Sequence, residues 1–332
     1  MREVLIERVL KTIRNYEMLK PQETVLAAVS GGPDSVFMLH ALNKLKKKLK
    51  IKKIAVCNLD HGIRDEESGV DSLFVKRIAG ELELKFVHKK IDLKSSKPKE
   101  FSMEEAARDE RYKFFKEAAN AASATVVATG HTLDDQAETV LMRLIKGSSL
   151  KGIVGISPAR NWEGLRIIRP LAELEKTEIL RYLHDAGILY RIDKTNTEDK
   201  YFRNVVRRDV VPFLEKYNPR LKRSLFNLAE HLREDLEFIT AEKSKAEIVK
   251  TGSTGKKVEV DLKDIIIQPR AIQKEILRDM LDKSGGLVKK LSFRHWKEME
   301  ALVRRKGKGS SVHLPGGVRV VRTDKTLTFS AI

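Results

Sequence analysis

Residues 24–42 read TVLAAVSGGPDSVFMLHAL, which is an apolar run, a short turn with two glycines and a second apolar run. The first run is typical of a buried strand and the second of a helix. Glycines let the backbone turn tightly, and Pro33 suits the first helical position because its missing N–H costs nothing there. The free N–H groups and the dipole of such a helix favour an anion above the strand end.

The hexapeptide SGGPDS at 30–35 could equally be an ordinary turn between a strand and a helix, and alone it does not decide between the two. Neither G-x-x-x-x-G-K-[ST] nor G-x-G-x-x-G occurs in the chain. SGGPDS resembles the pyrophosphate loop of the ATP pyrophosphatases, which cleave ATP between the α and β phosphates. The resemblance implies that ATP is bound by Ser30, Gly31, Gly32, Pro33, Asp34 and Ser35.

Apolar runs alternate with helical patterns through the first half of the chain. Strands are expected at 24–29, 54–59, 85–88 and 125–129, and helices at about 35–49, 69–83 and 102–122. This alternation predicts an α/β fold with a doubly wound, Rossmann-like parallel sheet. Ligands of such sheets bind beyond the carboxyl ends of the strands, where residues 30–35, 60–64 and 130–135 stand.

The pattern becomes mainly helical after about residue 165. Helices are expected at 220–248, 270–283 and 292–304, a loop at 251–255, and strands at 311–314 and 318–322 around a turn at 315–317. We expect a catalytic domain at 1–217 and a smaller basic α+β domain at 218–332.

The net charge of +18 is unevenly distributed. Residues 216–332 hold 26 Lys and Arg against 15 Asp and Glu. A basic lobe of this kind favours a nucleic acid as partner, although a solvated lysine-rich surface would give the same count. The basic residues Arg304, Arg305 and Lys306 are candidates for RNA contacts.

The remaining composition limits the function classes. Hydrophobic residues make up 41% of the chain, as in globular proteins, and no apolar run approaches the roughly 18 residues of a membrane span. The single cysteine, Cys57, leaves no pair for a disulfide within the chain. The first residues lack the apolar stretch of a signal peptide, so a cytoplasmic protein is expected.

Three acids follow the strand expected at 125–129. Thr132 and Asp135 have the spacing of a capping box, and Asp134, Asp135 and Glu138 fall on the first turns of one helix. Acids complement a helix dipole in any protein, which explains one of them without a function. Three acids beside a phosphate loop favour a cation, either Mg²⁺ on ATP or an ammonium substrate.

Two pairs of arginines have helical spacing. Arg108 and Arg111 share a face of the helix expected at 102–122, and Arg203 and Arg207 share another beside Asn204. Guanidinium groups suit phosphate recognition. Solvated helix faces would show the same pattern.

Five motifs in this order and spacing resemble those of tRNA(Ile)-lysidine synthetase, over roughly residues 20–220. They are SGGPDS at 30–35, DHGIR at 60–64, MEEAAR at 103–108, GHTLDDQAET at 130–139 and RNVVR at 203–207 with Pro212. Each motif alone is unspecific, and the set is specific.

The resemblance implies an enzyme that ligates free L-lysine to the wobble cytidine of tRNA(Ile) with a CAU anticodon. The 2-carbonyl oxygen of the base attacks the α-phosphate of ATP, and the lysine ε-amine then displaces AMP. The product, lysidine, changes the tRNA from methionine to isoleucine identity. The sequence leaves open whether the protein forms a homodimer.

The resemblance also implies residue roles, to which we add Mg²⁺ on Asp34. For catalysis they are Asp34, Asp135 and Arg203; for ATP, in addition to the loop, Asp60, His61, Met103 and Arg108; for lysine, Arg111, Asp134, Asp135 and Glu138; and for tRNA, Asn204 and Arg207. One carboxylate of the acidic cluster is our candidate for the base that accepts the proton of the lysine ammonium, whose ordinary pKa is ~10.4.

Four other interpretations are weaker. A tRNA thiolase on the same scaffold passes sulfur through cysteine or holds an iron–sulfur cluster, and Cys57 stands alone in an expected strand. A glutamine-dependent amidotransferase would need a nucleophilic cysteine in a second segment. A small-molecule synthetase would not need the basic C-terminal lobe. An RNA-binding protein without activity would not need both SGGPDS and the acidic cluster.

Overall fold

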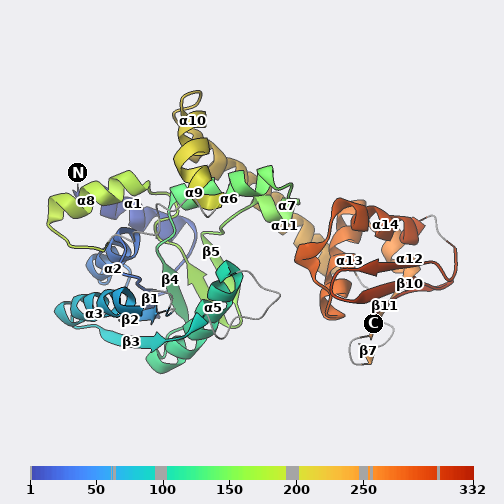
Figure 1. The fold of residues 1–332 in the computed structure, drawn as a ribbon, viewed down its shortest axis with the longest axis horizontal. Coiled ribbons are helices and arrows are strands. Elements are labelled where there is room, and N and C mark those ends of the chain that lie inside the picture. The colour runs from blue at the N-terminus through green and yellow to red at the C-terminus, as the bar shows by residue number, and fades with distance from the viewer. Residues whose placement is uncertain are drawn as a thin grey trace. The chain divides into compact units, whose positions relative to one another are not determined.

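A computed structural model of the chain describes residues 2–60, 62, 65–93, 103–191, 202–246, 253–254, 257–304 and 307–332. The chain forms two compact units, Met1–Glu230 and His231–Ile332, which are described separately (Figure 1).

The first unit is built on a six-stranded sheet in the order β3-β2-β1-β4-β6-β5. The strands are β1 (Thr24–Ala28), β2 (Lys53–Asp60), β3 (Lys85–Lys90), β4 (Val126–Thr129), β5 (Ala159–Trp162) and β6 (Leu165–Ile168). All neighbours pair in parallel except the edge strand β5, which is antiparallel to β6. Because β1 pairs with both β2 and β4, the carboxyl ends of these three strands meet at one edge.

Alternate residues of β1 face opposite layers of helices. Val25 and Ala27 pack with α1 (Arg2–Asn15), α2 (Pro33–Leu45), α3 (Asp65–Glu81) and α8 (Lys176–Ala186). Leu26 packs on the other face against Phe114 and Phe115 of α5 (Met103–Ala122) (Figure 1). Both faces are covered, which explains why β1 is an uninterrupted apolar run.

The remaining helices of this unit pack on one another beside the sheet. They are α6 (Leu133–Ile145), α7 (Leu150–Ile153), α9 (Phe202–Val205), a π-helical turn η2 (Val206–Val210), α10 (Val211–Glu215) and the start of α11 (Leu221–Lys245). Val140 of α6 packs with Val206, Val211 and Leu225 in one apolar cluster. This packing anchors the arginine segment at 203–208 against the acidic helix α6.

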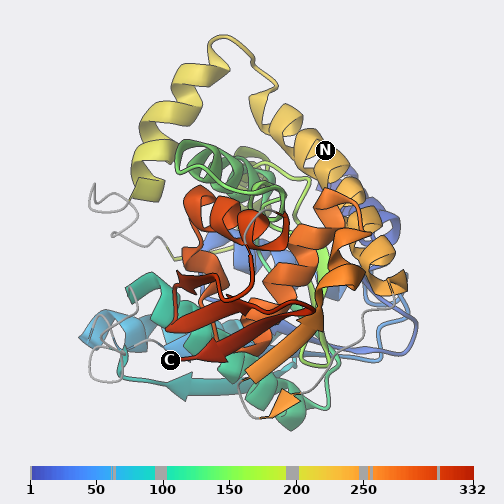
Figure 2. The ribbon, with the colours of Figure 1, turned by 90° about the vertical axis from the view of Figure 1, so that its right-hand side faces the viewer.

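The second unit holds a five-stranded antiparallel sheet in the order β7-β8-β11-β10-β9. Its strands are β7 (Ser253–Thr254), β8 (Lys257–Asp261), β9 (Ser311–Leu314), β10 (Val318–Arg322) and β11 (Thr326–Ala331) (Figure 2). Its helices are α12 (Leu262–Ile266), α13 (Arg270–Lys283), the 3₁₀ turn η3 (Val288–Lys290) and α14 (Phe293–Arg304). Val260 and Phe329 of the sheet share a core with Leu281 of α13 and Leu302 of α14.

The α/β class and the doubly wound sheet are confirmed, and so is the α+β character of the smaller unit. The sequence pattern did not reveal β5, β6, β8 and β11, and it predicted a loop where the two residues of β7 pair with β8. The expected boundary near 217 falls just before α11, and the two compact units divide within that helix. Within the described residues, no helix is both long and apolar enough to cross a membrane.

Candidate active site

The glycine turn between β1 and α2 is a preorganised loop. Gly31 has φ +92°, a left-handed backbone conformation that glycine adopts without strain, and Pro33 is the first residue of α2 as expected. The Ser35 hydroxyl donates to the Gly32 carbonyl oxygen (2.9 Å) and accepts from the Ser30 N–H (3.2 Å). Ser35 therefore closes the loop around the amino end of α2, where an anion is favoured.

Gly130 brings the end of β4 against this loop. A Cβ at Gly130 would lie 3.0 Å from the Ser35 nitrogen and 3.1 Å from the Asp34 carbonyl carbon, closer than ordinary contact. Only glycine fits here without displacing the backbone of α2. Two of the three sites expected at strand ends, residues 30–35 and 130–135, are thus in contact.

The third strand end is described only in part. Asp60 is buried, and its carboxylate accepts from the Gly62 N–H at 2.8 Å. His61, Ile63 and Arg64 lie outside the described residues. In the structure Asp60 thus stabilises the turn at Gly62. The ATP contact expected of Asp60 stays a prediction.

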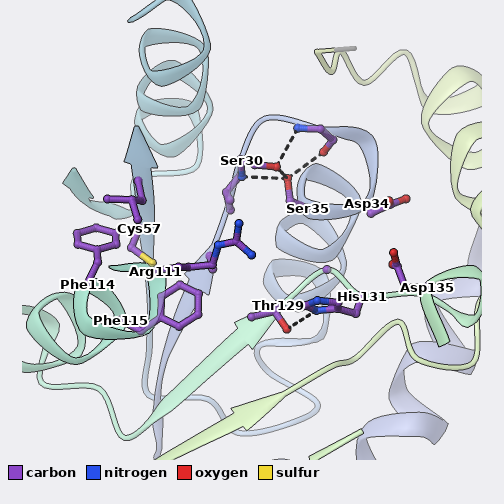
Figure 3. Close-up of a pocket in the computed structure, with 15 residues that line it drawn as sticks. Ser30, Asp34, Ser35, Cys57, Arg111, Phe114, Phe115, Thr129, His131 and Asp135 are labelled. Carbon is purple, nitrogen blue, oxygen red and sulfur yellow. Dashed lines mark hydrogen bonds between the residues drawn. The ribbon is translucent and has the colours of Figure 1, made fainter. Parts of the chain in front are cut away.

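A cavity of about 450 Å³ opens above these strand ends (Figure 3). Its polar lining includes Ser30, Asp34, Ser35, Arg111, His131 and Asp135. Its apolar lining includes Ala28, Cys57, Leu59, Phe114 and Phe115. The volume is within the range of small-molecule sites, and an apolar wall beside a helix amino end suits a nucleotide.

Asp34, on the first turn of α2, is the most unusual group of the cavity. Its Oδ1 is buried and has no hydrogen-bond partner, while Oδ2 lies 3.4 Å from the Lys176 ammonium. Burial raises the pKa of Asp34 to about 6, Lys176 counteracts this rise, and Asp135 adds to it. A buried carboxylate oxygen without a partner needs a proton or a cation.

Asp34 matches the ligands that magnesium takes in nucleotide sites, namely one or two carboxylates with phosphate oxygens and water. The described residues contain no group of three or more His, Cys, Asp or Glu side chains arranged for a metal ion. A metal here would therefore depend on the phosphates of a bound nucleotide.

Asp135 and Glu138 are tied to the arginines of the 203–207 segment. Asp135 forms the expected capping box with Thr132 and accepts from Arg203 Nη2 at 3.0 Å. Glu138 is almost fully buried and accepts from Arg203 Nε (2.7 Å) and from Arg207 Nε (2.6 Å) and Nη2 (3.0 Å). The π-helical turn begins between these two arginines, and both reach the same carboxylate.

These pairs set the charge of the cluster. Burial would raise the pKa of Asp135, but the Arg203 guanidinium and the hydrogen bond from the Thr132 N–H hold it below its usual value. Burial would lower the pKa of Arg203, but Asp135 and Glu138 raise it. Asp135 is therefore an ionised carboxylate that faces the cavity.

Asp134 points elsewhere. Its Oδ2 accepts from the Lys176 backbone N–H (2.8 Å), and its Oδ1 lies 2.9 Å from the Lys222 ammonium. Lys222 also lies 3.4 Å from Glu215 and 3.6 Å from Glu175. Of the three expected acids, only Asp135 lines the cavity, and Asp134 holds the amino end of α8.

His131 is a neutral imidazole on the cavity wall. Burial lowers its pKa to about 3, with Asp135 opposing this and Arg169, Arg203 and Arg111 reinforcing it. Its Nδ1 lies 3.0 Å from the Thr129 hydroxyl. The imidazole can therefore donate or accept a hydrogen bond at neutral pH but carries no charge.

The other expected site residues are dispersed. Arg111 turns into the cavity from α5 (Figure 3), whereas Met103, Arg108, Asn204 and Arg207 are described but do not line it. Arg304 lies in the second unit, where its guanidinium is 3.4 Å from the Gln273 side-chain oxygen. Arg305 and Lys306 fall outside the described residues.

Sequence reasoning missed Lys176 and Lys222, the lysines that contact Asp34 and Asp134. Neither belongs to a motif, and each reaches its partner only through the packing of α8 and α11 beside α6. No local signal in the sequence could have found them.

Comparisons with known proteins agree with this geometry. The family model described as a PP-loop domain matches residues 1–214. The tRNA(Ile)-lysidine synthase of Clostridioides difficile is 33% identical over 331 residues, which cover 98% of this chain and 71% of that protein. The tRNA(Ile)-lysidine synthase of Geobacillus kaustophilus is 33% identical over 338 residues, with 98% and 71% covered.

A solved structure shares the fold. The U34-tRNA thiolase NcsA from Methanococcus maripaludis, with its [4Fe-4S] cluster, has a TM-score of 0.59 and 23% identity, covering 70% of this chain and 80% of its own. At this identity the likeness concerns the fold alone. On the family model and the two relatives, the chain belongs to the tRNA(Ile)-lysidine synthase family of PP-loop proteins.

Proposed function

We propose that this protein uses ATP to ligate L-lysine to the wobble cytidine of tRNA(Ile) with a CAU anticodon. One observation carries the proposal: a loop suited to phosphate and the ionised Asp135 face one cavity. The loop suits activation by ATP, and the carboxylate suits an amine nucleophile. The reaction belongs in the cytoplasm, where ATP, lysine and tRNA are available together.

In the first step the 2-carbonyl oxygen of cytidine attacks the α-phosphate of ATP, and pyrophosphate leaves. The N–H groups at the amino end of α2 hold the phosphates and stabilise the charge of the leaving group. Asp34 would hold a magnesium ion through its unpartnered Oδ1. When bound, that ion offsets the negative charge of the triphosphate.

In the second step the lysine ε-amine attacks C2 of the activated base and AMP leaves. Free lysine is almost fully protonated at pH 7, with a pKa of ~10.4, so it enters as an ammonium group. Asp135 can pair with this ammonium and accept its proton, while Arg203 holds the carboxylate in place. Arg111, which also lines the cavity, is placed to pair with the lysine carboxylate or a phosphate.

A labelling experiment tests the proposal. The protein is incubated with labelled lysine, ATP, Mg²⁺ and total bacterial tRNA, and pyrophosphate release is followed in parallel. We expect label in the isoleucine tRNA with a CAU anticodon, and pyrophosphate release that requires both ATP and that tRNA. Pyrophosphate release without lysine incorporation at any concentration would refute a lysine ligase.

Thiolation, the alternative on the same scaffold, is disfavoured by Cys57. This residue lines the cavity, but burial raises the pKa of its thiol. A thiol in that state does not supply the thiolate that sulfur transfer requires. Substitution of Cys57 by serine should therefore leave ligation intact.

A further inference from the structure

Four arginines lie beside the cavity: Arg108, Arg160 and Arg169 lie close to Tyr112, and Arg143 lies close to Arg108. Arg108 and Tyr112 belong to α5, Arg143 to α6, Arg160 to β5, and Arg169 follows β6. The guanidinium carbons of Arg160 and Arg108 lie 5.0 and 5.4 Å from the centre of the Tyr112 ring. We call Arg108, Arg143, Arg160, Arg169 and Tyr112 the arginine–tyrosine cluster.

The positive charges of this cluster are not neutralised by the residues that the structure describes. Among those residues, none of the four arginines forms an ion pair with an acid. Arg143 and Arg169 donate hydrogen bonds to the neutral carbonyl oxygens of Gly152 and Ser157. The buried Nε atoms of Arg160 and Arg169 have no hydrogen-bond partner.

The arginines also repel one another. Burial lowers the pKa of Arg169 to about 10, and Arg160 and Arg108 act in the same direction against the favourable contact with Tyr112. Burial lowers the pKa of Arg143 as well, and Arg108 adds to this effect. Four like charges on four separate segments, with buried donors left open, are costly unless an anion binds there.

The cluster adjoins the cavity without being part of the ATP loop. Arg111, one helical turn from Arg108, lines the cavity, and Arg169 lowers the pKa of His131 on the cavity wall. Arg108, Arg143, Arg160 and Arg169 themselves do not line it. An anion bound to them would therefore lie next to the reacting groups, outside the phosphate loop.

We propose that the arginine–tyrosine cluster binds the backbone phosphates of the tRNA anticodon loop that flank the nucleotide in the cavity. The inference rests on the proposed function, and it assigns the arginine–tyrosine cluster beside the cavity to the tRNA. It also moves Arg108 from the ATP contacts to the RNA contacts.

Three features favour an RNA strand over the ATP phosphates. The charges come from four segments, which suits several phosphates better than one. Guanidinium forks match phosphate oxygens, and an aromatic ring among them offers a face for stacking or for cation–π contacts. The proposed function already assigns the ATP phosphates to the amino end of α2, where Gly32 is the N-cap residue.

The test measures binding without chemistry. A stem-loop RNA with the anticodon arm of the CAU isoleucine tRNA is titrated with the full chain across a salt series, without ATP or lysine. We expect Arg160→Gln and Arg108→Gln each to weaken binding about tenfold and to reduce the salt slope by about 1. The ATP affinity of Arg160→Gln, measured separately with Mg²⁺ by equilibrium dialysis, should be unchanged.

Two controls separate a specific contact from lost charge or lost folding. Arg181→Gln removes the same charge from the exposed face of α8 and should leave both affinities unchanged. Arg160→Lys keeps the charge and should restore the salt slope. Thermal unfolding of each variant checks that the fold is retained.

Single ethylated phosphates in the RNA locate the contact. Ethylation of a contacted loop phosphate should weaken the wild-type complex and have no further effect on Arg160→Gln. Unchanged RNA affinity and salt slope in both glutamine variants would overturn the inference, and so would a loss of ATP affinity alone. Because neither ATP nor lysine is present in the RNA titration, its outcome is independent of whether the wild type ligates lysine.

Discussion

Two groups of arginines flank the same cavity and differ in one respect. Arg203 and Arg207 are paired with Asp135 and Glu138 at 2.6–3.0 Å, so their charge is neutralised inside the protein. The arginines around Tyr112 have no acidic partner among the described residues. The difference shows that an arginine-rich sequence does not identify an anion site, because the acids that the fold supplies decide which charges remain free.

Arg203 and Arg207 hold the side chains of Asp135 and Glu138 in place, whereas the arginines of the arginine–tyrosine cluster are open to a ligand. Arg203 bridges Asp135 and Glu138, so a change in any one of the three disturbs the other two. Such coupled pairs are expected to be strongly non-additive in double variants. The unpaired arginines touch carbonyls and a tyrosine ring, and their removal disturbs little else.

The largest expected effect is in the paired group. Glu138→Gln removes the carboxylate that both arginines share, which leaves Arg207 without the acid it pairs with and Arg203 with Asp135 alone. We expect a loss of about 3 kcal/mol in the free energy of unfolding, since breaking a buried pair exposes an uncompensated charge. Urea denaturation measures it, and a loss below about 1 kcal/mol would show that the pairing is not structural.

Asp135→Asn tests the carboxylate of the paired group that lines the cavity. The amide keeps the size of the side chain but removes the charge that faces the cavity, so lysine attack should slow by about a hundredfold. Adenylate formation should be much less affected, and adenylated tRNA should accumulate in a single-turnover experiment. Equal slowing of both steps would show that Asp135 has no particular role toward lysine.

Sequence reasoning found what is encoded locally. The SGGPDS turn, Pro33 at the start of α2 and the Thr132–Asp135 capping box each lie within a few consecutive residues, and their geometry follows from backbone and spacing. The alternation of apolar runs likewise predicted the parallel strands. Strand β8 reads KVEVD, a period-two pattern that could have been recognised.

Contacts between distant segments were beyond such reasoning. Arg160 reaches Tyr112 across about fifty residues, from an edge strand too short and polar to be predicted. Whether Arg203 and Arg207 were paired depended on how η2 packs on α6. Sequence spacing shows which charges share a helix face, and only the fold shows which of them are neutralised.

Asp34 should have a third, smaller effect, on the pH dependence of stability. Its carboxylate is buried and only one of its oxygens lies near a cation, Lys176. Its pKa in the folded protein is about 6 against an ordinary 3.8, so the folded state holds the proton more tightly. The free energy of unfolding of the wild type should therefore fall by about 2 kcal/mol as the pH rises from about 4 to 7.

Asp34→Asn should abolish that fall, because the amide cannot ionise. Without nucleotide, the variant should be more stable than the wild type at pH 7 and about equal to it at pH 4, while losing ligation. Denaturant unfolding at both pH values measures this. Parallel stability profiles for the two proteins would contradict the raised pKa.

The smallest expected effect compares the two groups directly. Replacing an arginine by glutamine should lower the free energy of unfolding in the paired group, and leave it unchanged or raise it in the unpaired group. Arg207→Gln removes a partner of the buried Glu138 and should destabilise the protein by about 1–2 kcal/mol. Arg160→Gln removes a like charge and a buried donor without a partner, and should leave stability unchanged or raise it by about 0.5 kcal/mol. Thermal unfolding of the two variants side by side at low salt measures the difference. A comparable loss in both would mean that Arg160 is held by contacts as strong as those of Arg207, and the unpaired cluster would then be a structural element with no need of an anion.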